Sequence, residues 1–382
     1  MAVLLVLLAT VGMGMAARAA TAEAARFGVA LHPAAQLPGA DQFARMDRGK
    51  VASVRFQLYW HDIQKSRSDC SPVSTPSGSL LSTPNGCDWA DTDQVVAQAA
   101  QKGLRVLPFF YGTPEWLQPN GATDASSPVA TAEARAKWKA FVRAAAQRYG
   151  PNGAFWSSYA GPALPIRTWQ IWNEQNSTAK WAPRPSPKDY STLLELAHTA
   201  ITGVDPDARL MLGGMFGTPF RGRPSLTAWE FLDRLYDVKG IKGKFDQVAA
   251  HPYSENLRGI KYQVHELRRV MEAHRDRKTK LAVTEIGWGS GRPDGDGYSS
   301  FLLKGLKGQS TMLRKAFGLF NDRRRSWNLG VVYWFSLTNV RECGTPSGCP
   351  YWEDSAGLFR AGEPADPKPA WRAFTRFTGG KP

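Results

Sequence analysis

The sequence is poor in metal-binding side chains and in long apolar segments. It contains four cysteines and six histidines in 382 residues. No two cysteines have the C-x-x-C spacing of common zinc sites. After residue 15, no stretch is long and apolar enough to span a bilayer. We therefore expect no structural metal, no cofactor and no transmembrane helix in the folded part of the chain.

Signs of a multi-domain or nucleotide-binding protein are also missing. There is no internal repeat, and no Pro/Ser-rich linker separates two halves. No glycine-rich phosphate loop follows the first apolar strand, Phe27–Leu31, as it would in a doubly wound dinucleotide-binding sheet. Hydrophobic residues make up 43% and charged residues 21% of the chain, which is typical of a globular protein. The length suits one large α/β domain or two ordinary ones.

The first residues resemble a secretory signal peptide. Residues 1–15 form an apolar run, and Ala17-Arg18-Ala19 supplies small residues for cleavage. We expect a signal peptide over residues 1–25, a single domain over 26–382, and a secreted or extracytoplasmic location without stable membrane association. The basic start typical of signal peptides is missing, so an uncleaved membrane anchor is the alternative.

Export would favour disulfides over free thiols. Four cysteines allow three pairings. The local pairing joins Cys70 to Cys87 and Cys343 to Cys349, and each bridge would close a loop rich in Pro, Gly and Ser.

The net charge is +15. One interpretation is an acidic partner, such as an anionic glycan. The other is simply an arginine-rich composition, since the basic residues are scattered and the tightest run, Arg323–Arg325, lies near the end of a predicted helix, where cations suit the dipole. No basic motif indicates nucleic-acid binding, and we expect none.

Strands and helices alternate along the rest of the chain. This order predicts parallel strands joined by right-handed crossovers. Eight strand-like runs over this length predict a (β/α)8 TIM barrel, with a doubly wound open sheet as the alternative. The expected strands are Phe27–Leu31, Val51–Gln57, Leu104–Phe110, Ile166–Trp172, Arg209–Met215, Phe245–Ala250, Leu281–Ile286 and Gly330–Leu337. The expected helices are Asp41–Arg48, Trp89–Lys102, Ala132–Tyr149, Pro187–Val204, Leu226–Val238, Tyr262–His274, Leu302–Trp327 and Ala370–Phe377.

Two of these strands share an unusual design. The fourth is followed by Asn173 and Glu174, and the seventh carries Glu285 near its end. Carboxylates at the ends of apolar strands are costly to bury without partners. In a parallel barrel both would face the same mouth. One can then act as a general acid and the other as a nucleophile or base, which suits cleavage of a glycosidic bond. Considered alone, each glutamate could instead be a structural carboxylate that caps a loop or pairs with an arginine.

Other strand ends and mouth loops supply groups that could bind a sugar. Arg55 could keep one glutamate ionised, and aromatic rings could form apolar platforms under a sugar ring. Each has a structural alternative, such as a buried ion pair or a core aromatic. The predicted binding residues are His32, Arg55, Trp116, Asn173, His251, Tyr253, Trp288 and Trp334, with Trp60 and Trp181 as weaker candidates.

These residues resemble the large clan A superfamily of retaining (β/α)8 glycoside hydrolases. Trp172-Asn173-Glu174 is similar to the clan's strand-four acid/base motif, and Val283-Thr284-Glu285 to its strand-seven nucleophile motif. Arg55, His251, Tyr253 and Trp334 also match; in the clan, this tryptophan often precedes a non-proline cis peptide. Family 39-like and family 5-like enzymes are the most similar. The resemblance implies that Glu174 is the acid/base and Glu285 the nucleophile.

The sequence therefore predicts a secreted retaining hydrolase acting on a poly- or oligosaccharide, and an acidic glycan is one interpretation of the basic charge. A transglycosylase or an exopolysaccharide-processing hydrolase would use the same residues. A barrel that has lost catalysis and only binds glycans is the alternative from another class.

Overall fold

The computed structural model describes residues 27–70, 87–119, 122–217, 225–292, 300–342, 351–362 and 364–382. The predicted signal peptide and the predicted Cys343–Cys349 bridge lie outside these residues. Cys70 and Cys87 form a disulfide with Cα atoms 5.4 Å apart, as the local pairing predicted.

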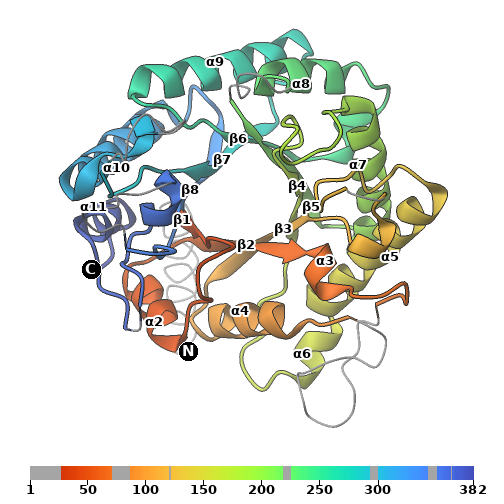
Figure 1. The fold of residues 1–382 in the computed structure, drawn as a ribbon, viewed down its shortest axis with the longest axis horizontal. Helices are drawn as coiled ribbons and strands as arrows, with labels where there is room; N and C mark the ends of the chain where they lie inside the picture. Colours follow the sequence, from red (N-terminus) through yellow and green to blue (C-terminus); the bar gives the residue numbers. More distant parts are fainter. Residues whose placement is uncertain are drawn as a thin grey trace, which may run out of the picture.

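The described strands form a closed parallel barrel in which β1 pairs with both β2 and β8 (Figure 1). Their order along the barrel follows their order in the sequence. The predicted (β/α)8 barrel is confirmed, and the open sheet is wrong. The strands are β1 Phe27–Ala30, β2 Ser53–Tyr59, β3 Arg105–Tyr111, β4 Thr168–Asn173, β5 Arg209–Phe216, β6 Gln247–His251, β7 Lys280–Ile286 and β8 Leu329–Phe335.

The helices surround the barrel (Figure 1). The eight predicted helices are present; Ala132–Tyr149 has the predicted bounds, and the others differ at one or both ends. The largest difference is at α9, which begins at Leu257 because Asn256 caps it by accepting hydrogen bonds from the Arg258 and Gly259 amides. Two short helices were not predicted, α3 and α6. The helices are α2 Ala40–Arg48, α3 Trp60–Ile63, α4 Ala90–Gln101, α5 Ala132–Tyr149, α6 Ala154–Ser158, α7 Pro187–Thr202, α8 Ala228–Tyr236, α9 Leu257–Ala273, α10 Gly305–Arg323 and α11 Pro369–Thr378.

Many tryptophans belong to the core between barrel and helices. Trp60 stacks on Phe141 of α5 with ring centroids 5.6 Å apart, and Trp181 packs against Trp172 at 5.5 Å. Both Trp60 and Trp181 are almost fully buried. Each fills space behind the strands, so neither is placed for the sugar contact that the sequence suggested.

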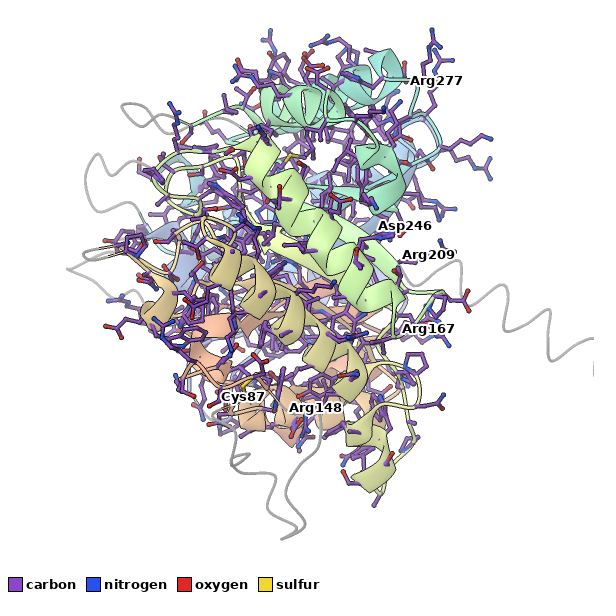
Figure 2. All side chains as sticks on the ribbon, turned by 90° about the vertical axis from the view of Figure 1, so that its right-hand side faces the viewer. Cys87, Arg148, Arg167, Arg209, Asp246 and Arg277 are labelled. Carbon is purple, nitrogen blue, oxygen red and sulfur yellow. A yellow bond between two sulfur atoms is a disulfide. The ribbon has the colours of Figure 1, made fainter. Side chains whose placement is uncertain are left out.

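Ion pairs lie at the end of the barrel opposite the mouth (Figure 2). Arg167, just before β4, pairs with Asp205 at 3.2 Å, and Arg209, at the start of β5, pairs with Asp246 at 2.9 Å. These pairs lie at the N-terminal ends of strands, where barrel residues typically serve stability. In the part of the chain that the structure describes, no helix has the length and apolarity to cross a membrane.

Candidate active site

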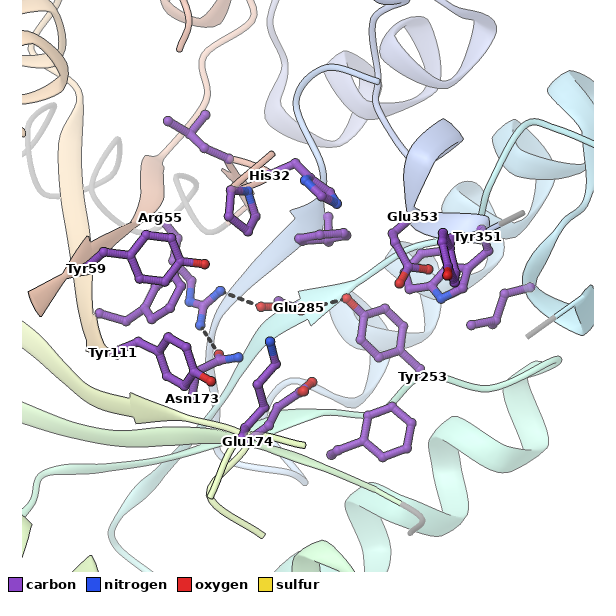
Figure 3. A pocket seen from close by; sticks show the side chains of 18 of the residues that line it. His32, Arg55, Tyr59, Tyr111, Asn173, Glu174, Tyr253, Glu285, Tyr351 and Glu353 are labelled. Atoms are coloured by element: carbon purple, nitrogen blue, oxygen red, sulfur yellow. Dashed lines mark hydrogen bonds and ion pairs between the residues drawn. The ribbon is translucent and has the colours of Figure 1, made fainter. Parts of the chain in front are cut away.

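A cavity of about 660 Å³ opens at the C-terminal ends of the strands (Figure 3). Its walls come from the ends of six strands and from the loops that follow β1, β4, β6, β7 and β8. Both predicted catalytic glutamates line it, together with Arg55, Asn173 and Tyr253. The rule that parallel strands end at one mouth therefore placed these side chains correctly.

The two glutamates approach each other across the cavity floor. One carboxylate oxygen of Glu174, one of Glu285 and a ring nitrogen of His251 all lie within 4.8 Å of one another. The Glu285 side chain is 10% exposed and that of Glu174 is 14% exposed. The two carboxylates therefore share a largely desolvated site, in which electrostatic interactions are stronger than in water.

Glu285 is held by a cation and a phenol. Arg55 Nη1 donates to its Oε1 at 2.7 Å, and the Tyr253 hydroxyl donates to its Oε2 at 2.8 Å. Burial by itself raises the pKa of Glu285, but the charges of His251 and Arg55 and these hydrogen bonds together hold it below its ordinary value. Glu285 is therefore ionised at neutral pH.

Arg55 is itself positioned on every side. Its Nε donates to Gln170 Oε1 at 2.6 Å and its Nη2 to Asn173 Oδ1 at 2.7 Å. The guanidinium carbon lies 4.0 Å from the centroid of the Phe109 ring. Strands β2, β3, β4 and β7 thus meet at one buried cation, and Asn173 is oriented by it with its amide N–H groups left for other partners.

Glu174 has a different environment. His251 Nδ1 lies 2.9 Å from Glu174 Oε1, and its Nε2 lies 3.0 Å from Thr284 Oγ1. The fully buried imidazole fits there because residue 214 is glycine: a Cβ on Gly214 would lie 2.0 Å from His251 Nε2. The backbone of Glu174 has φ +50°, a left-handed conformation that side chains other than Asn, Asp and Gly seldom adopt and that is often found at functional sites.

Glu174, His251 and Glu285 are also a potential metal-ligand set, since each offers one ligand atom. Arg55 already pairs with Glu285, so a divalent ion here would lie close to a guanidinium. Hydrogen bonds to Arg55, Tyr253 and Thr284 account for the arrangement of these side chains.

The strand-eight platform was predicted one residue too early. Trp334 is fully buried, donates to the Ala356 carbonyl at 3.0 Å and packs against Phe317 of α10. Phe335 lines the cavity instead. Successive side chains of a strand point to opposite faces, so only one of this pair can face the mouth. The non-proline cis peptide also follows Phe335, joining it to Ser336.

The other two predicted tryptophans do not line the cavity either. Trp288 is fully buried against Trp334, and its Nε1 donates to the Ser254 carbonyl at 2.9 Å. Trp116 lies in the loop after β3, where its Nε1 donates to the Gln64 carbonyl at 3.1 Å and Arg67 covers its ring. Neither is placed in the cavity wall, and the only polar atom of each is bonded to the backbone. His32 does line the cavity, as predicted.

Several lining residues were missed by the sequence reasoning. Tyr59 and Tyr111 are the last residues of β2 and β3, so the rule that found the glutamates applies equally to them. Phe216 and Phe335 are likewise the last residues of β5 and β8. Nothing in the sequence indicated the remaining ones, which lie outside the strands. The unpredicted lining residues include Tyr59, Tyr111, Lys180, Phe216, Phe301, Phe335, Tyr351, Trp352 and Glu353.

The barrel carries one glutamate directly after β4 and another near the end of β7, the arrangement that the resemblance found in the sequence predicted. No family model and no curated protein matches this sequence. Solved structures of glycoside hydrolases share its fold. A family 39 glycoside hydrolase from the gut symbiont Bacteroides cellulosilyticus WH2 is 20% identical, with a TM-score of 0.62 over 94% of this chain and 64% of that chain.

Two further structures extend the comparison. A β-xylosidase from Caulobacter crescentus CB15 is 18% identical, with a TM-score of 0.59 over 91% of this chain and 67% of that chain. A family 5 subfamily 18 enzyme from Streptomyces cattleya, in complex with GlcNAc, is 14% identical, with a TM-score of 0.63 over 93% and 80%. This chain spans less than two thirds of the family 39 enzyme. The similarity establishes the shared (β/α)8 fold of these glycoside hydrolases, in agreement with the resemblance found in the sequence.

Proposed function

We propose that this chain is a retaining glycoside hydrolase that cleaves O-glycosidic bonds in a poly- or oligosaccharide. The observation that carries the proposal is the separation of the two carboxylates, whose oxygens approach within 4.8 Å. Retaining enzymes place the two groups about 5–5.5 Å apart, whereas inverting enzymes leave about 6.5–9.5 Å for a water molecule.

The environments of the two carboxylates divide the roles. Glu285, ionised and held by Arg55 and Tyr253, attacks the anomeric carbon. Glu174 gives its proton to the departing glycosidic oxygen as that bond breaks. Glu174 then takes a proton from water, and the resulting hydroxide displaces Glu285 from the anomeric carbon. His251, bonded to Glu174, is a positioning residue. Phe335 and Trp352 supply apolar surface in the cavity.

A secreted or extracytoplasmic location is part of the proposal. The Cys70–Cys87 disulfide supports it, since disulfides persist mainly in oxidising compartments. The reaction described needs only protein carboxylates and water.

A panel of aryl glycosides and polysaccharides tests the activity. We expect at least one to be cleaved with retention, seen by proton NMR of the first-formed anomer. Glu285→Gln should lower kcat by at least about 10⁴-fold, while the exposed Glu272→Gln on α9 should match the parent. Glu174→Ala should regain turnover with azide, which needs no general base. An inverted product would refute the retaining mechanism. Glycan binding without turnover would indicate a binding barrel.

A further inference from the structure

One cation in the cavity has no carboxylate partner. Of the cations among the described lining residues, Arg55 is neutralised by Glu285, but no carboxylate lies within 4.0 Å of Lys180 Nζ. Lys180 Nζ lies 5.2 Å from the centroid of the Tyr111 ring. The lysine backbone is anchored, because its carbonyl accepts from Trp172 Nε1 at 2.8 Å and its amide donates to Ser177 at 3.0 Å. An ammonium is thus held over the cavity without a counterion.

Two tyrosine hydroxyls accompany this lysine. Tyr59 and Tyr111 line the same cavity with ring centroids 5.8 Å apart. Neither hydroxyl has a hydrogen-bond partner among the residues that the structure describes. Burial raises the pKa of both phenols above the usual value, so both keep their protons and can donate.

His32 adds a further donor. Its Nδ1 accepts from the Ala34 amide at 3.0 Å, which leaves the ring proton on Nε2. Burial lowers the pKa of His32 to about 4, against the opposing effect of the Glu285 charge and with a smaller contribution from the Lys180 charge. The imidazole is therefore neutral at pH 7, and its Nε2–H has no partner among the described residues. We call His32, Tyr59, Tyr111 and Lys180 the donor cluster.

The other side of the cavity carries an unused hydrogen-bond acceptor. In Figure 3, His32, Tyr59 and Tyr111 lie to one side of Glu285, while Glu353 and Tyr351 lie to the other. Glu353 Oε2 is buried without a hydrogen-bond partner in the described structure. Among the described residues, the unused ring and hydroxyl donors therefore lie on one side of Glu285 and the unused carboxylate oxygen of Glu353 on the other.

We propose that the donor cluster is a subsite for an anionic substituent of the glycan, either the carboxylate of a uronic acid or a sulfate ester. This rests on the proposed glycosidase function and narrows its substrate class. An anion beside Lys180 pairs with the ammonium and accepts from the neighbouring donors of the cluster, and such charge-assisted bonds are the strong ones. A neutral hydroxyl would leave the lysine charge unpaired in a partly desolvated cavity.

Matched substrates test this subsite. Each acidic polysaccharide cleaved is compared with its carboxyl-reduced or desulfated counterpart, so that the two arms distinguish carboxylate from sulfate. We expect kcat/KM to favour one charged form by about 10- to 100-fold, and Lys180→Met to remove that preference by raising KM. Lys180→Arg should retain most of it. Lys188→Met removes an exposed lysine outside the cavity and should change nothing. Equal cleavage of both forms, or an equal loss of kcat on both in Lys180→Met, would overturn the subsite.

Binding separates this proposal from the catalytic one. Glucuronate, galacturonate and glucose 6-sulfate, each with its neutral sugar, are titrated into the parent and Lys180→Met proteins by NMR. The parent is preferable to Glu285→Gln, because that change would free Arg55 to bind anions. We expect one acidic sugar to bind at least 10-fold more tightly than its neutral partner, and only in the parent. If no glycan is cleaved, the hydrolase proposal fails, but this titration still tests the subsite. Equal binding of acidic and neutral sugars would reject the subsite.

Discussion

Removing the Arg55 charge should shift the pH dependence of catalysis. Arg55→Met keeps much of the apolar stem but loses the 2.7 Å bond to Glu285 Oε1. A hydrogen bond to a charged group contributes about 1.5–3 kcal/mol, and one pKa unit corresponds to about 1.4 kcal/mol. The pKa of Glu285, now below its ordinary value, should therefore rise by about 1–2 units in the variant.

The sign of the effect follows from the role of Glu285. Attack needs the ionised carboxylate, so kcat/KM falls as the pH drops through the pKa of Glu285 in the free enzyme. With Arg55 removed, this acidic limb should move upward by about 1–2 pH units. Arg55→Lys keeps a charge but lacks the planar fork that also reaches Gln170 and Asn173, so it should shift the limb less.

Arg148→Met is the matched control. Arg148 is equally buried and pairs with Asp93 through Nε at 2.9 Å, but it lies among α4, α5 and α6, away from the cavity (Figure 2). The Arg148→Met substitution should lower the free energy of unfolding by about 3–5 kcal/mol without moving the acidic limb of the kcat/KM profile. A folded Arg55→Met protein whose acidic limb coincides with that of the parent would refute the reasoning and assign the ionisation of Glu285 to His251.

Three further predictions concern neighbouring features. Phe335→Ala should raise KM about 10-fold, whereas Trp334→Ala should leave KM unchanged and lower the free energy of unfolding by about 3–5 kcal/mol. Kinetics and denaturant titration on both variants check this; a raised KM in Trp334→Ala alone would show that Trp334 faces the mouth. Lys368→Met removes donors to three acceptors, two of them buried, and should lower the free energy of unfolding by about 2–4 kcal/mol; unchanged thermal unfolding would contradict this. Replacing Cys70 and Cys87 by Ser opens a loop with a sequence separation of 17 and should cost about 3 kcal/mol; an unaltered melting temperature would contradict this.

Strand ends explain why much of the site could be predicted. Arg55, Asn173, Glu174, Tyr253 and Glu285 lie on strands or directly after them, and the alternation of strands and helices already implied one common mouth. The hydrophobic runs were long enough to locate every strand to within a few residues, because buried parallel strands must be apolar on both faces.

The wrongly placed tryptophans are those whose position depended on the register of a strand or on the path of a loop. Trp334 and Phe335 are both aromatic, and only the pairing of β8 with β1 and β7 shows which of them faces the mouth. Trp116 and Trp288 lie in mouth loops, yet their indole N–H groups turn inward to backbone carbonyls. The composition of these loops does not predict the direction in which the indole groups point.

The sequence by itself determined the barrel, its mouth and the two glutamates, since these follow from periodicity and from the direction of parallel strands. The tertiary structure decided what surrounds them. Arg55 neutralises Glu285, while Lys180 has no carboxylate partner among the residues that the structure describes, although both are simply basic residues in the sequence. The difference is distance: a charge is neutralised only when the folded chain brings a carboxylate within about 4 Å.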